Sequence, residues 1–137
     1  MMLLYHNPKC STSRNVLAAI RASGATPVVV DYLRDGWTKP QLQLLFVAAG
    51  LTPREALRTR APEAAGLEDA GEDELLEAML RHPVLVERPF VASERGVRLC
   101  RPAGRLLSLL EAPLPADFRK EDGSLFVSAA DSRMASR

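Results

Sequence analysis

Cys10 is the residue with the clearest capacity for chemistry, because it follows a short apolar strand and stands where a helix begins. The pattern predicts the strand over residues 2–6 and the helix from about residue 13. Unpaired backbone N–H groups and the positive end of the helix dipole favour negative charge at such a point. A thiol placed there ionises more easily, and the thiolate is its reactive form. The same N–H groups would bind an oxyanion beside the sulfur.

The neighbours of Cys10 favour a reactive thiol over a buried one. Free cysteines are often small buried hydrophobes, but this one stands in a polar loop. Arg14 and Asn15 open the first helical turn, and Arg14 either binds an anion or points into solvent. His6 closes the strand, and it either polarises the thiol, donates to an anion or makes a structural hydrogen bond. The remaining polar neighbours are Lys9, Ser11, Thr12 and Ser13.

Three arginines stand at the ends of predicted elements rather than in their middles: Arg58, Arg88 and Arg101. Guanidinium groups bind tetrahedral oxyanions through two parallel hydrogen bonds. Taken singly, each arginine is more often a surface charge. Sequence spacing alone does not bring the three together.

The composition is that of an ordinary globular domain. A chain of 137 residues with 47% apolar content suits a single domain. It has no apolar run near the roughly 20 residues that span a bilayer and no secretion signal, so we expect a cytoplasmic protein without a membrane partner. The net charge of +1 gives no reason to expect nucleic acid as a partner.

The chain contains two cysteines, Cys10 and Cys100. Two cysteines without a secretion signal do not predict a disulfide framework. The residue three positions after Cys10 is Ser13, so the Cys-x-x-Cys dithiol motif is absent. Any redox cycle at Cys10 would therefore need a second thiol from elsewhere. Cys100 lacks a polar loop around it, and we expect it to be structural.

The first elements form a strand–helix–strand unit. A helix over about 13–23, closed by Gly24, lies between strands over 2–6 and 26–31. Two buried strands joined by one helix imply a parallel pair.

A helical segment follows this unit. Thr38 can cap a helix over about 39–49, and further helices are predicted over 53–58 and 72–81. The segment over about 38–82 therefore reads as an all-helical insertion.

The C-terminal part is predicted to return to strands, over 84–92 and 97–99, with a hinge near residues 94–96. Pro102 then starts a last helix. Residues 113–137 are predicted as a docked loop followed by a frayed end.

This order of elements is the layout of a thioredoxin-like domain. We therefore predict an α/β fold over residues 1–137, with a mixed four-stranded sheet, flanking helices and the helical insertion. Folds of this type commonly place a cis-proline against the active cysteine, so the Arg88–Pro89 bond is predicted to be cis.

The loop from His6 to Asn15 closely resembles the active-site loop of the glutaredoxin-coupled arsenate reductases. The likeness covers nearly the whole chain in the family's order, with a somewhat shortened insert around residues 61–72. It continues through Ala56-Leu57-Arg58, His82-Pro83-Val84-Leu85-Val86-Glu87-Arg88-Pro89, Arg98-Leu99-Cys100-Arg101-Pro102 and Lys120-Glu121-Asp122-Gly123.

The resemblance implies roles for residues by position. Cys10 matches the nucleophile, and His6 matches the histidine linked to its activation. Arg58, Arg88 and Arg101 match the arginines that hold the oxyanion, beside Ser11 and Thr12. The supporting residues would be Ser13, Arg14, Asn15 and Pro89.

The resemblance also implies a reaction, which is the detoxifying reduction of arsenate. The thiolate attacks arsenate, glutathione enters as co-substrate, glutaredoxin supplies further reducing equivalents and arsenite leaves. No metal and no bound organic cofactor would be required. Two alternatives remain open at this point. One is a redox-responsive regulator of the Spx type, which binds RNA polymerase; Ser13 in place of a second cysteine counts against it. The other is a related reductase that acts on another oxyanion or a mixed disulfide.

Overall fold

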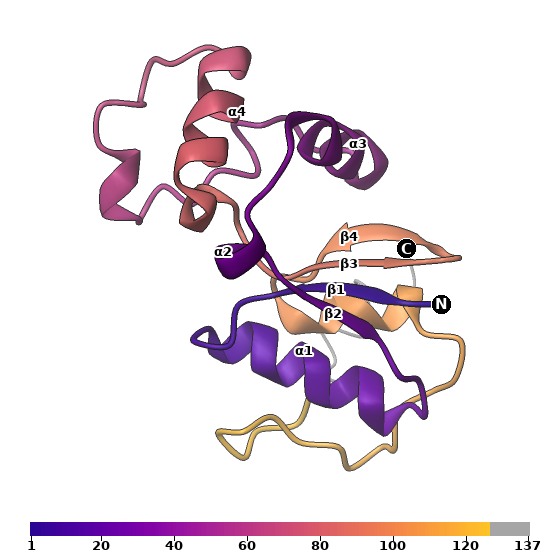
Figure 1. The fold of residues 1–137 in the computed structure, drawn as a ribbon. Helices are drawn as coiled ribbons and strands as arrows, with labels where there is room; N and C mark the ends of the chain where they lie inside the picture. The colour runs from indigo at the N-terminus through magenta and orange to yellow at the C-terminus, as the bar shows by residue number, and fades with distance from the viewer. Residues whose placement is uncertain (127–137) are drawn as a thin grey trace. The chain divides into compact units, whose positions relative to one another are not determined.

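The computed structural model describes residues 1–126. The chain divides into two compact units, which we describe separately (Figure 1). Met1–Asp31 and Arg88–Arg137 form the first, here called the sheet unit, and Tyr32–Glu87 forms the second, here called the helical unit. Cys10 belongs to the sheet unit.

The sheet unit contains a mixed four-stranded sheet with the strand order β2-β1-β3-β4. Its strands are β1 (Leu3–His6), β2 (Val28–Asp31), β3 (Phe90–Ser93) and β4 (Gly96–Leu99). β1 runs parallel to β2 and antiparallel to β3, and β3 runs antiparallel to β4. The predicted α/β class, mixed sheet and parallel first pair are confirmed.

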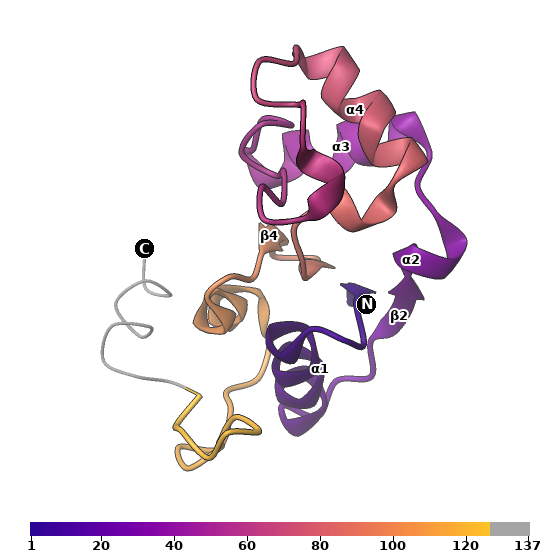
Figure 2. The same cartoon turned by 90° about the vertical axis from the view of Figure 1, so that its left-hand side faces the viewer.

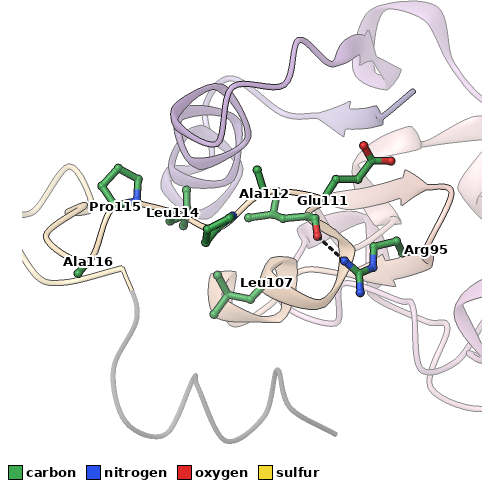
Figure 3. Close-up of a pocket in the computed structure, with 9 residues that line it drawn as sticks. Arg95, Leu107, Glu111, Ala112, Leu114, Pro115 and Ala116 are labelled. Atoms are coloured by element: carbon green, nitrogen blue, oxygen red, sulfur yellow. Dashed lines mark hydrogen bonds between the residues drawn. The ribbon is translucent and has the colours of Figure 1, made fainter.

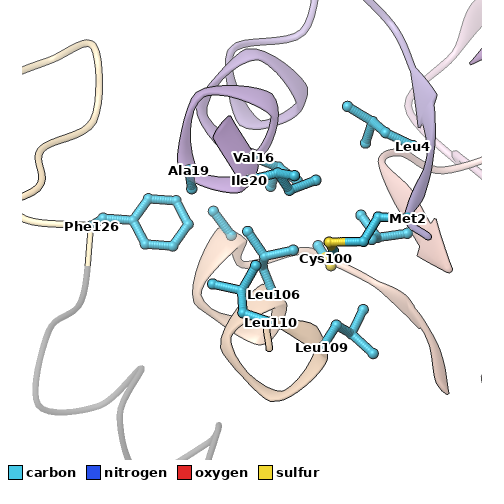
Figure 4. Packing of buried hydrophobic residues seen from close by; sticks show 12 residues of the cluster. Met2, Leu4, Val16, Ala19, Ile20, Cys100, Leu106, Leu109, Leu110 and Phe126 are labelled. Atoms are coloured by element: carbon cyan, nitrogen blue, oxygen red, sulfur yellow. The ribbon is translucent and has the colours of Figure 1, made fainter. Parts of the chain in front are cut away.

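Two helices cover one face of this sheet, α1 (Ser11–Ala22) and the 3-10 helix η3 (Ala103–Leu109) (Figure 1). Their apolar side chains meet those of β1 and β3 in one core (Figure 4). α1 begins two residues earlier than predicted, so Cys10 lies directly at its N-terminus. The buried residues of this core are Met2, Leu4, Val16, Ala19, Ile20, Val91, Cys100, Ala103, Leu106, Leu109, Leu110 and Phe126.

The last predicted helix is present, but it is a 3-10 helix. Ala103, Leu106 and Leu109 are its buried positions, at 4%, 0% and 1% exposure. Their spacing of three residues matches the three-residue turn of a 3-10 helix, which stacks every third side chain on one face.

The helical unit contains three α-helices and two short 3-10 helices, seen from a second side in Figure 2. The predicted helix at 39–49 is confirmed as α3 (Lys39–Ala49), with Thr38 and Gln41 forming a capping box. The predicted helix at 72–81 is confirmed as α4 (Glu72–Arg81). The others are α2 (Tyr32–Asp35), which the sequence analysis missed, η1 (Pro62–Ala64) and η2 (Pro83–Leu85).

Two predictions around the helical unit are wrong for one physical reason. The helix predicted at 53–58 is a turn, and the strand predicted from residue 84 begins only at Phe90. Leu57 and Val86 instead form an isolated antiparallel bridge. The two segments therefore satisfy their backbone groups against each other, which neither local pattern could reveal.

The C-terminal segment passes beside α1 and returns to the core of the sheet unit (Figure 1). Phe126 is fully buried and its ring packs edge-on against Phe118, with a centroid distance of 5.7 Å. The predicted docked loop is thus confirmed up to residue 126, and the predicted frayed end lies outside the described residues. Within residues 1–126 we find no helix that meets the length and hydropathy needed to cross a membrane.

Candidate active site

A tight turn delivers Cys10 to the start of α1. The Asn7 carbonyl oxygen accepts a hydrogen bond from the Cys10 N–H at 3.0 Å, which closes a four-residue turn with Pro8 second. Proline at this position and asparagine at the first are favoured in such turns. The Asn7 side chain also accepts a hydrogen bond from the Lys9 N–H at 2.9 Å. Asn7 is a shaping residue that the sequence analysis did not single out, although the Asn-Pro pair was a signal for it.

Cys10 is mostly buried, at 9% exposure, but its surroundings are polar. The Arg101 Nη1 atom donates to the Cys10 Sγ at 3.6 Å. Burial raises the pKa of the Cys10 thiol, but the Ser13 backbone N–H, a hydrogen bond and charge from Arg88, and the charge of Arg101 outweigh it. The net result is a lowered pKa. The site therefore favours the thiolate.

The β3–β4 hairpin brings Arg88 and Arg101 together. In its register Phe90 pairs with Leu99, so the residues two positions beyond each, Arg88 and Arg101, lie at the same end of the hairpin. Arg101 Nη1 donates to the Arg88 carbonyl oxygen at 3.2 Å. Because Tyr5 of β1 pairs with Phe90, the same end of the sheet carries the turn that holds Cys10.

Arg88 is the residue best placed to bind an anion. Its side chain is buried, at 8% exposure, and its Nε and Nη1 atoms have no hydrogen-bond partner within residues 1–126. Buried polar groups in native proteins are almost always hydrogen-bonded, and an uncompensated buried cation is costly. An oxyanion beside Cys10 would supply an acceptor that this guanidinium lacks.

His6 is buried, and its ring contacts Ser13. His6 Nδ1 and Ser13 Oγ are hydrogen-bonded at 2.6 Å, and Ser13 Oγ also accepts from the Asn7 N–H at 3.1 Å. Burial is the main cause that lowers the pKa of His6, which favours its neutral form at pH 7. Of the roles left open for His6, this geometry shows the structural hydrogen bond, which ties the strand end to the first turn of α1.

The other predicted residues fall into two groups. Ser11 is exposed and Thr12 is partly exposed, and both lie in the first turn of α1, beside Cys10. Arg14 and Asn15, in contrast, contact Glu121: the Arg14 side chain is exposed, at 43%, and is paired with the Glu121 carboxylate rather than left unpaired for an anion.

Arg58 lies in the helical unit, where its Nη1 atom is 3.8 Å from Glu87 Oε1. Its place in the anion site stays a prediction. The Arg88–Pro89 bond is cis, as predicted, and so is the Arg101–Pro102 bond, which the sequence analysis did not predict.

Cys100 offers no second reactive thiol. It is fully buried in the core shown in Figure 4, and burial raises its pKa to about 12. This environment agrees with the structural role predicted for it. Among the residues that the structure describes, no group of three His, Cys, Asp or Glu side chains could hold a metal ion.

A cavity of about 530 Å³ lies elsewhere in the sheet unit (Figure 3). It is lined mainly by apolar side chains, including Leu107 and Leu114, and Arg95 at its edge donates to the Leu110 carbonyl oxygen at 2.9 Å. Cys10 is not among its lining residues. We place the chemistry at Cys10, because a nucleophile and unsatisfied cationic donors meet there.

The lowered pKa of Cys10 makes a prediction about thiol alkylation. Only the thiolate reacts, so the rate of reaction with iodoacetamide should rise with pH through the pKa of Cys10. The midpoint should lie below about 8.5, the value of an unperturbed cysteine. Mass spectrometry of the native protein over a pH series measures it, and Cys100 should stay unmodified. A midpoint at or above 8.5 would mean that the cations do not offset burial.

The chain is similar to known proteins over most of its length. The model of the ArsC family matches residues 5–109. The chain is 49% identical over 138 residues to arsenate reductase ArsI2 of Synechocystis sp., across 98% of this chain and 99% of that protein. It is 44% identical over 135 residues to an arsenate reductase of Rhizobium meliloti, across 96% of each. The structure of an arsenate reductase from Vibrio cholerae matches with a TM-score of 0.75 and 34% identity, covering 80% of this chain and 97% of that one.

Proposed function

Because the chain belongs to the ArsC family, we propose that it is an enzyme that reduces arsenate to arsenite with Cys10 as its nucleophile. Relatives that carry the name arsenate reductase extend from 49% to 38% identity over nearly the full chain. The observation that carries the proposal is the buried guanidinium of Arg88, whose two unpaired nitrogens lie in the site of a thiol with a lowered pKa.

Arsenate is a tetrahedral oxyanion with charge close to that of phosphate, roughly −1.5 to −2 at neutral pH. Arg88 and Arg101 would neutralise this charge, and the N–H groups of the first turn of α1, at Ser11 and Thr12, would donate to its oxygens. Arg58 is proposed as a third cation, on the resemblance alone. The thiolate of Cys10 then attacks arsenic, and one oxygen leaves as water after protonation. Arsenic is still pentavalent in the resulting cysteine–arsenic adduct.

The reducing electrons must come from outside the chain, since Cys100 is buried and its pKa is raised. We propose glutathione as the thiol that attacks the adduct and glutaredoxin as the protein that resolves the remaining mixed disulfide. In total, two thiols become one disulfide, and their two electrons take arsenic from the pentavalent to the trivalent state. This choice of donors fits the cytoplasmic location expected from the sequence, where glutathione is abundant.

The site gives different support to the two alternative functions, a redox-responsive regulator and a reductase of another oxyanion or a mixed disulfide. Nothing in the site favours a dithiol switch of the Spx type, since Ser13 occupies the second cysteine position and its hydroxyl is hydrogen-bonded to His6. Another oxyanion of similar charge and shape would meet the same cations. Competition by phosphate against arsenate therefore measures the selectivity of the anion clamp, the name we give to Arg88 and Arg101 as the proposed anion-binding residues.

The test is a coupled assay that follows arsenate-dependent oxidation of NADPH with glutathione, glutathione reductase and glutaredoxin. We expect turnover with the complete mixture and its loss when glutathione or glutaredoxin is left out. Absence of arsenate-dependent oxidation in the complete mixture would contradict the proposed reaction. Equal turnover without glutathione would contradict only the proposed electron donors.

A further inference from the structure

Glu121 contacts the first turns of α1, although it lies 107 positions from Arg14 in the sequence. Its carboxylate accepts two hydrogen bonds from the Arg14 guanidinium, from Nε to Oε2 at 3.0 Å and from Nη2 to Oε1 at 2.7 Å. Its backbone N–H donates to Asn15 Oδ1 at 2.9 Å. Two consecutive helix residues therefore hold this one residue of the C-terminal segment.

The remaining donor of Arg14 reaches the turn that delivers Cys10. Arg14 Nη1 donates to the Pro8 carbonyl oxygen at 2.9 Å. Pro8 occupies the middle of that turn, two residues before the sulfur-bearing residue. Since the carboxylate fixes the plane of the guanidinium, Glu121 also fixes the direction in which Arg14 holds the Pro8 carbonyl.

The segment that carries Glu121 forms a hydrogen-bonded turn between two packed phenylalanine rings. The Lys120 N–H donates to the Ser124 carbonyl oxygen at 2.8 Å, and Gly123 adopts a φ of 88° that favours glycine. On either side of this turn, the rings of Phe118 and Phe126 contact each other, and Phe126 is fully buried in the core. These contacts restrict the backbone of the turn, and therefore the position of the Glu121 side chain.

The ion pair also places a negative charge at the start of α1. The first turn of α1, as the structure describes it, contains no acidic residue, and a cation there opposes the helix dipole. Glu121 supplies the missing negative charge from another part of the chain. Hydrogen bonding within the pair raises the pKa of Arg14 and lowers the pKa of Glu121, so both are ionised at neutral pH. Three nitrogens of Arg14 thereby have acceptors in Glu121 and Pro8, whereas Arg88 keeps unpaired donors.

We propose that Glu121 is a positioning residue for the reaction at Cys10, acting through Arg14 on the Pro8 carbonyl to fix the turn that presents the sulfur. Its role in turnover rests on the proposed function, whereas its role in placing the sulfur does not. Glu121 lies beyond residues 5–109, the part of the chain that the family model matches.

The test compares Glu121→Gln with Asp117→Asn. Both replace a carboxylate of the same segment by an amide of the same size, but Asp117 is exposed and makes no ion pair within the described residues. In the coupled assay, Glu121→Gln should lower kcat about tenfold, the scale of loss for a slightly misplaced reacting group, with an unchanged KM for arsenate. Asp117→Asn should match the natural protein.

Alkylation of Cys10 by iodoacetamide gives a readout that needs no arsenate reduction. In Glu121→Gln the rate at high pH, where all of the thiol is ionised, should rise several-fold, because a less fixed turn exposes the sulfur. The midpoint of the pH profile should not rise, since the substitution removes negative charge near the thiolate. If the natural protein fails to reduce arsenate, this measurement still decides whether Glu121 positions the sulfur.

A double variant tests whether Glu121 acts through Arg14. Arg14→Met should reproduce the fall in kcat and the faster alkylation at high pH, and the combination should be no worse than Arg14→Met alone, because both interrupt one chain of contacts. Additive losses would overturn the proposal. An unchanged alkylation rate at high pH in Glu121→Gln would overturn it as well, as would a midpoint that rises, since that would make Glu121 part of thiol activation.

Discussion

Replacing Cys10 with serine should abolish arsenate reduction, with a loss of more than about 1,000-fold, on the scale seen when an enzyme loses its nucleophile. A serine hydroxyl in the same place stays protonated at neutral pH, because the cations that lower the pKa of a thiol cannot bring an alcohol near its ionisation. The coupled assay with arsenate, glutathione and glutaredoxin measures the loss.

Anion binding should survive this substitution. Arg88 and Arg101 stay in place, and removal of the thiolate charge leaves them more available to an oxyanion. Arsenate or phosphate should therefore raise the thermal midpoint of Cys10→Ser at least as much as that of the natural protein. Cys100→Ala is the matched control and should retain turnover, because the Cys100 side chain is fully buried in the core of the sheet unit. Residual turnover by Cys10→Ser near that of the natural protein would remove Cys10 from the role of nucleophile.

The part of the site that could be predicted from the sequence is the part set by local structure. Short sequence patterns account for the strand, the turn around Pro8 and the start of a helix at Cys10. Each of these patterns has a local physical cause. The cap at Thr38 is another such signal, since its side chain and that of Gln41 satisfy each other's backbone donors. None of these features depends on a distant residue.

Arg88 and Arg101 lie close together because of the register of the β3–β4 hairpin. The sequence contains enough information to predict this register once the two turn residues are known. A two-residue turn at Glu94 and Arg95 pairs Ser93 with Gly96, and counting back along the hairpin places Arg88 opposite Arg101. The sequence predicts the hinge only as a region near residues 94–96, which does not fix the pairs of the hairpin. An uncertainty of one residue in the turn would have placed the two side chains on opposite faces.

The remaining features came from contacts that no local pattern encodes. The pairing of Leu57 with Val86 replaced a predicted helix and shortened a predicted strand. The Glu121–Arg14 pair joins residues 107 positions apart. Arg14, a candidate anion ligand, instead connects Glu121 to the Pro8 carbonyl oxygen. In each case a long-range hydrogen bond satisfied groups that local propensity had assigned elsewhere.

Replacing Arg88 with methionine should weaken arsenate binding without weakening the fold. Each charge-assisted hydrogen bond contributes roughly 1.5–3 kcal/mol, so KM for arsenate should rise by about 10- to 100-fold. The alkylation midpoint of Cys10 should also rise, because a hydrogen bond and a positive charge that favour the thiolate are lost. The free energy of unfolding should not fall, since methionine fills similar volume and removes a buried cation with two unpaired nitrogens.

Arg88→Lys separates charge from geometry in the same site. A lysine retains the positive charge, so the alkylation midpoint should stay close to that of the natural protein. Its ammonium group lacks the planar fork, so much of the loss in arsenate binding should remain. Steady-state kinetics, the pH profile of alkylation and urea unfolding of both variants measure these effects. An unchanged KM in Arg88→Met would contradict the anion clamp, and a fall in unfolding free energy that accounts for the lost turnover would make Arg88 a structural residue. The two nitrogens of Arg88 that lack a partner would then need another acceptor, because buried polar groups in native proteins are almost always hydrogen-bonded.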